Sequence, residues 1–102
     1  MQWLWLNGTK VTDSGLEHLK GISSLQRLFL HDTKITDEGL EHLERHAELE
    51  FLYLNGTKVT DSGLEHLKGL MRLKELDLSN TNVTDEGVKK LKKALPNCNI
   101  FH

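Results

Sequence analysis

Apolar residues recur along this chain with a period of 24 residues. The four blocks 1–24, 25–48, 49–72 and 73–96 align with one another, and a remnant, 97–102, begins a fifth. Leucines occupy positions 1, 4 and 6 of the blocks, except that Met1 holds the first place in block one. The alternation at the start of each block predicts a short strand, and the later Gly-Leu-x-x-Leu spacing predicts the buried stripe of a short helix.

A single 24-residue block is too small to bury its own leucines. Stacked blocks would share one continuous core, and each short strand would pair in parallel with the strand of the next block. The pattern therefore predicts an α/β solenoid, in which residues 1–102 form one domain of four repeats followed by a C-terminal cap remnant.

Aspartate and glycine recur around the start of each expected helix. A carboxylate there can accept unpaired backbone N–H groups of the first turn and face the positive end of the helix. Glycine is costly inside a helix, so its presence in every block predicts a close backbone approach between stacked repeats. The aspartates are Asp13, Asp37, Asp61 and Asp85, and the glycines are Gly15, Gly39, Gly63 and Gly87.

The run L-x-x-L-x-L-x-x-T-x-[VI]-T-D-x-G-L-x-x-L resembles the 24-residue leucine-rich repeats common in bacterial proteins, notably the planctomycete type. The resemblance covers essentially the whole chain, and residues 93–100 are similar to a frequent last-repeat ending. It implies a right-handed leucine-rich repeat solenoid, a horseshoe arc with the parallel sheet on its concave face and short helices on its convex face. For function, it implies an interaction scaffold without naming a partner.

Residues 6–21 and 54–69 are identical, which indicates either a recent duplication or an engineered array. The chain also starts at a leucine position without a polar N-terminal cap, and terminal repeats need capping for solubility. We expect either a piece of a longer solenoid or a first strand, Met1–Leu6, that pairs with another chain.

Composition narrows the function classes. The 15 acidic and 13 basic residues give a net charge of -2, which argues against a nucleic-acid-binding surface. No apolar stretch approaches the ~20 residues that span a bilayer, and no signal-peptide pattern is present. Cys98 is the single cysteine, so no internal disulfide can form, as is typical of a reducing, cytoplasmic setting. We expect Cys98 to fill space in the cap; a reactive thiol is the alternative.

Residues that the core does not use carry the function. In a leucine-rich horseshoe the outward strand positions line the concave face, and five of the six aromatic residues fall there, with Phe101 the exception. Two interpretations remain open: stabilising cross-strand pairs, or an exposed aromatic interface. The candidate binding residues are Trp3, Trp5, Arg27, Phe29, His31, Phe51, Tyr53, Asn55, Glu75 and Asp77.

Histidines recur on the convex side, at His18, His42 and His66. A metal site or a pH-responsive stripe is one interpretation, and a solvated helix face copied by duplication is the other, which we favour. His42 and His46 have the i, i+4 spacing of helical metal ligands but lack a further ligand. Because His46 stands where other blocks have an aliphatic residue, we interpret it as a local packing defect. No metal, cofactor or catalytic residue is expected.

The sequence therefore predicts a non-enzymatic module that binds a protein or peptide through an aromatic-rich concave face. The first alternative is a self-associating scaffold or idealised array, a homo-oligomer that pairs through the first strand or the aromatic patch. The second is carbohydrate binding, because flat aromatic rings suit sugar faces.

Overall fold

The computed structural model describes residues 2–22 and 24–102, so the strand-start position expected at Met1 lies outside the described residues. The elements follow in the order β1 (Gln2–Trp5), α1 (Asp13–Leu16), a 3-10 helix η1 (Glu17–Gly21), β2 (Leu25–Phe29), α2 (Asp37–Glu41), β3 (Phe51–Tyr53), α3 (Asp61–Leu64), a 3-10 helix η2 (Glu65–Leu67), β4 (Glu75–Asp77), α4 (Asp85–Ala94) and β5 (Asn99–Phe101).

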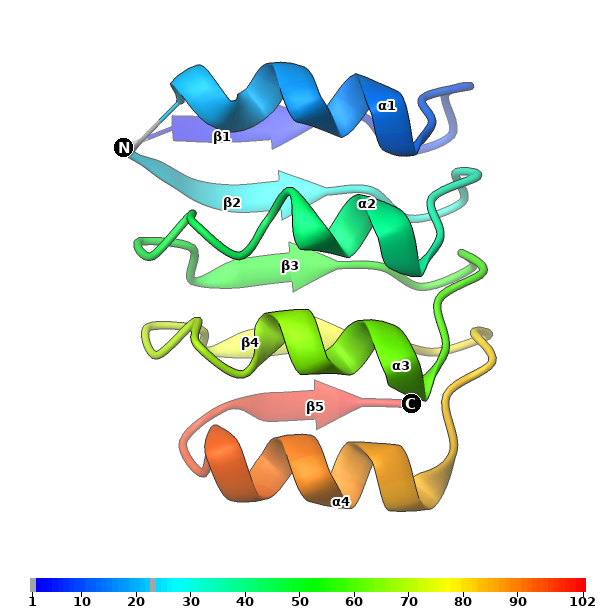
Figure 1. Ribbon diagram of the computed structural model, residues 1–102, viewed down its shortest axis with the longest axis vertical. Coiled ribbons are helices and arrows are strands. Elements are labelled where there is room, and N and C mark those ends of the chain that lie inside the picture. The colour runs from blue at the N-terminus through cyan, green and yellow to red at the C-terminus, as the bar shows by residue number, and fades with distance from the viewer. Residues whose placement is uncertain (1, 23) are drawn as a thin grey trace.

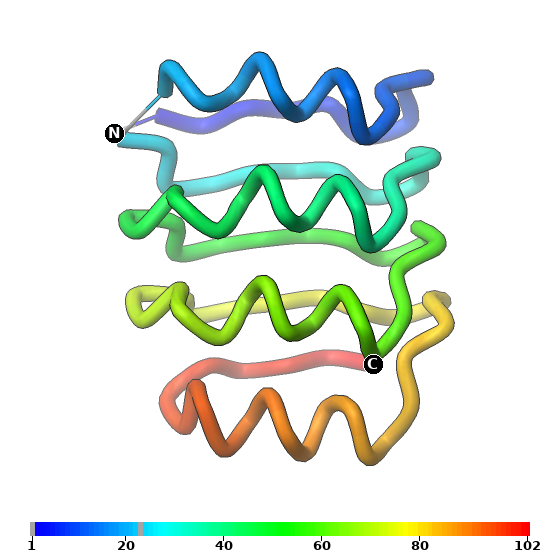
Figure 2. The backbone as a smooth tube through the Cα atoms, in the orientation of Figure 1, coloured from blue at the N-terminus to red at the C-terminus, as the bar shows by residue number. Residues whose placement is uncertain are grey.

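The five strands form one open parallel sheet in chain order, and the helices make a second layer on one of its faces (Figure 1). Each repeat adds one strand and one helix along the longest axis of the molecule (Figure 2). Leucines at block positions 4 and 6, which belong to the strand segment, and at block positions 16 and 19, which belong to the helical segment, fill the space between the layers. The predicted α/β leucine-rich repeat arc is confirmed.

Neighbouring repeats are joined by a carboxylate that crosses between them. Asp37 Oδ1 accepts a hydrogen bond from the backbone N–H of Thr60 at 2.7 Å, and its Oδ2 accepts from the Thr60 hydroxyl. Asp13 binds Thr36 in the same way, and Asp61 binds Thr84. These bonds hold the pKa of the Asp61 carboxyl below its ordinary value.

The expected role of these aspartates as caps of their own helices is therefore wrong. Threonine takes the N-cap position of each helix, and the aspartate that follows is the first helical residue. From that place its side chain reaches the N-cap threonine of the next repeat, 23 residues further along the chain. An ionised acceptor makes a stronger hydrogen bond than a neutral one, so the bridge ties the repeats together.

The recurring helix glycines make room for this carboxylate. A Cβ atom on Gly39, Gly63 or Gly87 would overlap Oδ1 of the aspartate from the preceding repeat. At Gly63 the same atom would also lie 2.9 Å from Leu40 Cδ1. Stacked repeats do approach each other closely at these three glycines, but the contact is with a side chain of the neighbouring repeat and not, as was expected, with its backbone.

The turn after each strand requires a left-handed backbone. Gly8 and Gly56 have φ of +66° and +74°, and the equivalent Asp32 and Asn80 have φ of +56° and +57°. Glycine adopts this region without steric cost, and aspartate and asparagine tolerate it better than other residues. The repeat therefore varies this position only within the set of residues that the turn permits.

His46 is the exception in the core. It is 3% exposed, and neither ring nitrogen has a hydrogen-bond partner among the described residues. Its position is held by Ile22 in the first block and Leu70 in the third. Burial lowers the pKa of His46 because it disfavours the charged imidazolium. The backbone of Ile22 raises this pKa, but its effect is the smaller of the two. The interpretation of His46 as a packing defect is confirmed.

The identical segments 6–21 and 54–69 allow a direct test of the bridge. Gly63 meets Asp37 of the preceding repeat, whereas an added Cβ on Gly15 would meet only Val11 Cγ2, at 2.9 Å. We expect Gly63→Ala to lower the free energy of unfolding by about 2–3 kcal/mol through overpacking. We expect Gly15→Ala to cost less than about 1 kcal/mol in the same urea titration.

Gly69→Ala is the matched control, because no atom lies within 4 Å of the Cβ that it would add. It should leave the unfolding midpoint nearly unchanged. Equal losses at Gly15 and Gly63 would show that the glycine serves its own helix and not the contact between repeats.

The buried imidazole predicts a pH dependence of stability. Because the pKa of native His46 lies below its ordinary value of 6.5, the unfolded chain binds more protons as the pH falls below that value. Stability contributed by His46 is thus present above pH 6.5 and is lost in acid. We expect His46→Leu to raise the free energy of unfolding by about 1–2 kcal/mol at neutral pH and to flatten its decline between about pH 7 and pH 5. His18→Leu, at an exposed histidine, should leave that decline unchanged.

Candidate functional site

The face of the sheet that points away from the helices consists of strand positions 3 and 5. We call it the open sheet face. Strand register aligns these positions in two columns that run across all five strands. One column is Trp3, Arg27, Phe51, Glu75 and Asn99, and the other is Trp5, Phe29, Tyr53, Asp77 and Phe101.

Three aromatic rings stack along the second column. The Phe29 and Tyr53 ring centroids are 4.9 Å apart with the ring planes inclined by only 7°, and Trp5 lies 5.1 Å from Phe29 in a tilted arrangement. The stack remains open to solvent at its β1 end, where Trp5 is 65% exposed. The contact with Phe29 thus covers only part of the aromatic surface of Trp5.

The first column holds a cation between two rings. The guanidinium carbon of Arg27 lies 4.3 Å from the ring centroid of Trp3 and 4.2 Å from that of Phe51. Arginine is attracted to aromatic faces at such distances because the ring carries negative charge density on its face. Arg27 is therefore held by its two neighbours, and Trp3 still keeps 47% of its surface exposed.

Phe101 also belongs to this surface, so its exclusion from the aromatic set was wrong. It pairs with Asp77 in the register of β4 and β5, and it is 49% exposed. The 24-residue period could have placed it, because Phe101 is position 5 of the fifth block. Asn99, at position 3 of that block, was missed for the same reason.

The polar residues expected at position 7 flank the columns at the end of the strands. His31 lies edge-on to Phe29, with the ring centroids 6.5 Å apart. Its Nδ1 atom is buried and has no hydrogen-bond partner among the described residues. Asn55 is half-buried, and its carbonyl oxygen accepts the backbone N–H of Asp32. His31 therefore keeps one ring nitrogen unpaired at the edge of the aromatic stack.

Charge changes along the open sheet face. Beyond Tyr53 the columns continue with Glu75 and Asp77, so the aromatic part ends at a pair of carboxylates on β4. Burial raises the pKa of Tyr53, and both carboxylates raise it further, while Arg27 opposes them. All ten residues expected to bind lie on this face or at its edge.

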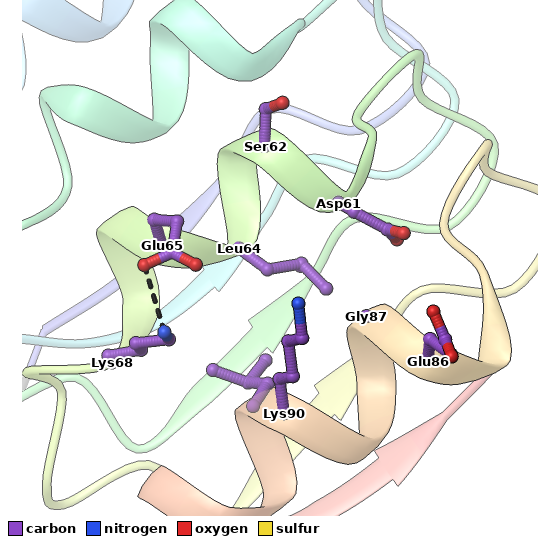
Figure 3. Close-up of a pocket in the computed structure, with 9 residues that line it drawn as sticks. Asp61, Ser62, Leu64, Glu65, Lys68, Glu86, Gly87 and Lys90 are labelled. Carbon is purple, nitrogen blue, oxygen red and sulfur yellow. Dashed lines mark ion pairs between the residues drawn. The ribbon is translucent and has the colours of Figure 1, made fainter.

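The helical side offers no comparable site. A cavity of about 270 Å³ lies between α3 and α4, where Glu65 and Lys68 form an ion pair at 2.9 Å (Figure 3). Asp61 at its rim is already bound to Thr84. Across residues 2–22 and 24–102, no three metal-ligating side chains cluster closely enough to hold an ion. Within the same ranges, no helix has the length and apolar character needed to cross a membrane.

Two further candidates from the sequence, His66 and Cys98, are also engaged or buried. His66 Nδ1 contacts Glu44 Oε1 of the preceding repeat. Cys98 is fully buried, and desolvation raises the pKa of its thiol. A thiol kept protonated is a poor nucleophile, so Cys98 serves as the expected core filler.

Comparisons with known proteins agree with this architecture. The family profile described as Leucine Rich repeat matches residues 70–92. Among curated proteins, no sequence matches the chain. A leucine-rich repeat protein of Leptospira interrogans superposes with a TM-score of 0.78 at 22% identity, over 100% of this chain and 25% of its own. An internalin from Listeria monocytogenes superposes with a TM-score of 0.65 at 21% identity, over 99% of this chain and 34% of its own.

The chain thus spans a quarter to a third of these two proteins, and the likeness shows a shared fold. The 24-residue pattern, the match over residues 70–92 and the shared solenoid together identify the fold of this chain as a leucine-rich repeat solenoid.

Proposed function

We propose that this chain is a non-enzymatic binding module that holds a protein or peptide on its open sheet face. The observation that carries the proposal is the aromatic stack that runs from Trp5, which is 65% exposed, across the half-buried Phe29 to the half-buried Tyr53. Large contiguous aromatic surfaces are uncommon on the solvent side of a monomer and often mark interfaces. Tryptophan and tyrosine are also enriched among the residues that dominate binding energy.

Cross-strand stabilisation accounts for only part of this surface. Pairs of aromatic residues on adjacent strands contribute roughly 0.2–1 kcal/mol each, which explains why Phe29 is packed between two neighbours. Trp5 keeps 65% of its surface in solvent beside its contact with Phe29. A smaller side chain there would satisfy the sheet equally well, so the tryptophan is better explained by a partner.

The partner that fits this face combines an apolar anchor with polar groups around it. The rings of Trp5 and Tyr53 suit the anchor, and the polar residues His31 and Asn55 flank them at the ends of the strands. A peptide laid across the strands would meet the aromatic part first and the carboxylates of β4 next. The face carries no arrangement of nucleophile and base, which is why we propose binding without catalysis.

Self-association is the second candidate, favoured by the edge position of β1. Among the described residues, β1 is hydrogen-bonded to β2 alone, and an exposed strand edge can pair with another chain. A copy of the same chain could pair there or cover the aromatic rings.

We expect Trp5→Ala to weaken peptide binding without unfolding the domain. The probe is a set of peptides selected from a random library on the immobilised wild-type chain, with affinities measured by isothermal titration calorimetry. Loss of a central aromatic anchor should lower affinity at least about tenfold, and Tyr53→Ala should act in the same direction.

Met71→Ala is the matched control, since Met71 is 70% exposed but lies outside the open sheet face. Its affinities should equal those of the wild type. Unchanged binding in Trp5→Ala, or its unfolding, would reject the aromatic face as the binding site. A glycan array probed with the same variants separates carbohydrate from peptide ligands.

Light scattering over a concentration series should give the mass of a monomer. This outcome leaves the open sheet face free for a partner. A dimer that persists on dilution and disappears in Trp5→Ala would instead favour self-association through the rings. A dimer unaffected by that substitution would place the contact at the edge of β1.

A further inference from the structure

The two columns of the open sheet face place a charged residue between aromatic rings at two points. In the first column, Arg27 on β2 lies between Trp3 on β1 and Phe51 on β3. In the second column, Asp77 on β4 lies between Tyr53 on β3 and Phe101 on β5. Both ring pairs are two strands apart, which is about 10 Å at the backbone.

The first of these sites shows what the spacing accommodates. The Arg27 guanidinium fits between its two rings with nearly equal distances to each, 4.3 Å and 4.2 Å. Rings two strands apart on this sheet can therefore enclose one planar cation. Tyr53 and Phe101 are likewise two strands apart in the register, but the intervening residue is an acid, so this site has no cation from the chain itself.

The geometry of the second site leaves its walls accessible. Tyr53 stacks one face on Phe29, with ring planes only 7° apart. Its opposite face is consequently directed along the column toward β4 and β5. Phe101, on the other side of Asp77 in the same column, is 49% exposed. The shorter side chain of Asp77, which we call the floor of the site, lies between the two aromatic residues in the register.

The floor of this site carries negative charge that no internal cation neutralises. Asp77 Oδ1 accepts the backbone N–H of Ser79 at 3.0 Å, which orients the carboxylate. Glu75 lies two residues away on the same face. Among the ion pairs of the described residues, none involves either acid, and the nearby Lys74 is paired with Glu50 instead, at 3.3 Å.

We propose that the site formed by Tyr53, Asp77 and Phe101 binds an arginine side chain of the partner peptide. The guanidinium would enter between the two rings and donate hydrogen bonds to the Asp77 carboxylate, with Glu75 beside it. Arginine suits such a site because its planar group stacks on aromatic faces and also matches carboxylate geometry. This inference rests on the proposed function and assigns the chemistry of one contact within it.

The test compares one arginine-containing peptide with its citrulline analogue, which has nearly the same shape but no charge. The peptide is taken from the library selection on the wild-type chain, where we expect enrichment of arginine near an aromatic or aliphatic residue. Replacing that arginine by citrulline should lower the affinity for wild type about tenfold, as expected for one cation–π contact combined with one exposed ion pair.

Asp77→Asn keeps the shape of the floor and the acceptor for Ser79 but removes the charge. In this variant, and in Phe101→Ala, the arginine and citrulline peptides should bind with similar affinity. Glu38→Gln removes an exposed acid on the helical side and should leave the tenfold difference intact. Thermal unfolding of each variant checks that the fold is retained.

The outcomes separate this inference from the proposed function. Peptides that depend on Trp5 but show no arginine enrichment, or a citrulline penalty that is unchanged in Asp77→Asn, would overturn the arginine site while the binding face stands. Failure to select any peptide that depends on Trp5 would overturn both. A penalty that is present in wild type and absent in both variants supports the site.

Discussion

A carboxylate shared between neighbouring repeats is the contact on which this solenoid depends. The carboxylate of the first helical residue binds the N-cap threonine of the next repeat, at Asp13, Asp37 and Asp61. Gly39, Gly63 and Gly87, each three residues after the bound threonine, lack the Cβ that would overlap the carboxylate of the preceding repeat. Because the acceptor comes from one repeat, and the donor and the empty space come from the next, the contact forms only when the repeats stack in one register.

That register determines what the open sheet face can display. Strand positions 4 and 6 must be apolar because they meet the core, whereas positions 3 and 5 face solvent. Identical positions of successive repeats are adjacent, so any residue type placed at position 5 becomes part of a column. Each repeat thus contributes one residue to the second column, which consists of the stacked rings of Trp5, Phe29 and Tyr53 followed by Asp77.

The same spacing gives opposite environments to Arg27 and Asp77, the two charged residues of the face that lie between aromatic residues. Arg27 is an internal cation held by two rings, so it is satisfied without a partner. Asp77 lies between two rings that attract cations but brings a negative charge of its own. The contrast arises from a single change of residue within a constant framework, which is how repeat proteins can vary recognition while retaining their fold.

The sequence by itself determined the period, the class of fold, the buried leucines and the face that carries the aromatic residues, because each follows from residues at constant spacing. Only the tertiary structure decided that Asp37 binds Thr60 and that His46 is buried without a partner. Each of these depends on atoms that belong to another repeat. Gly15 and Gly63 illustrate the reason: their local sequences are identical, yet only Gly63 meets a carboxylate from the repeat before it.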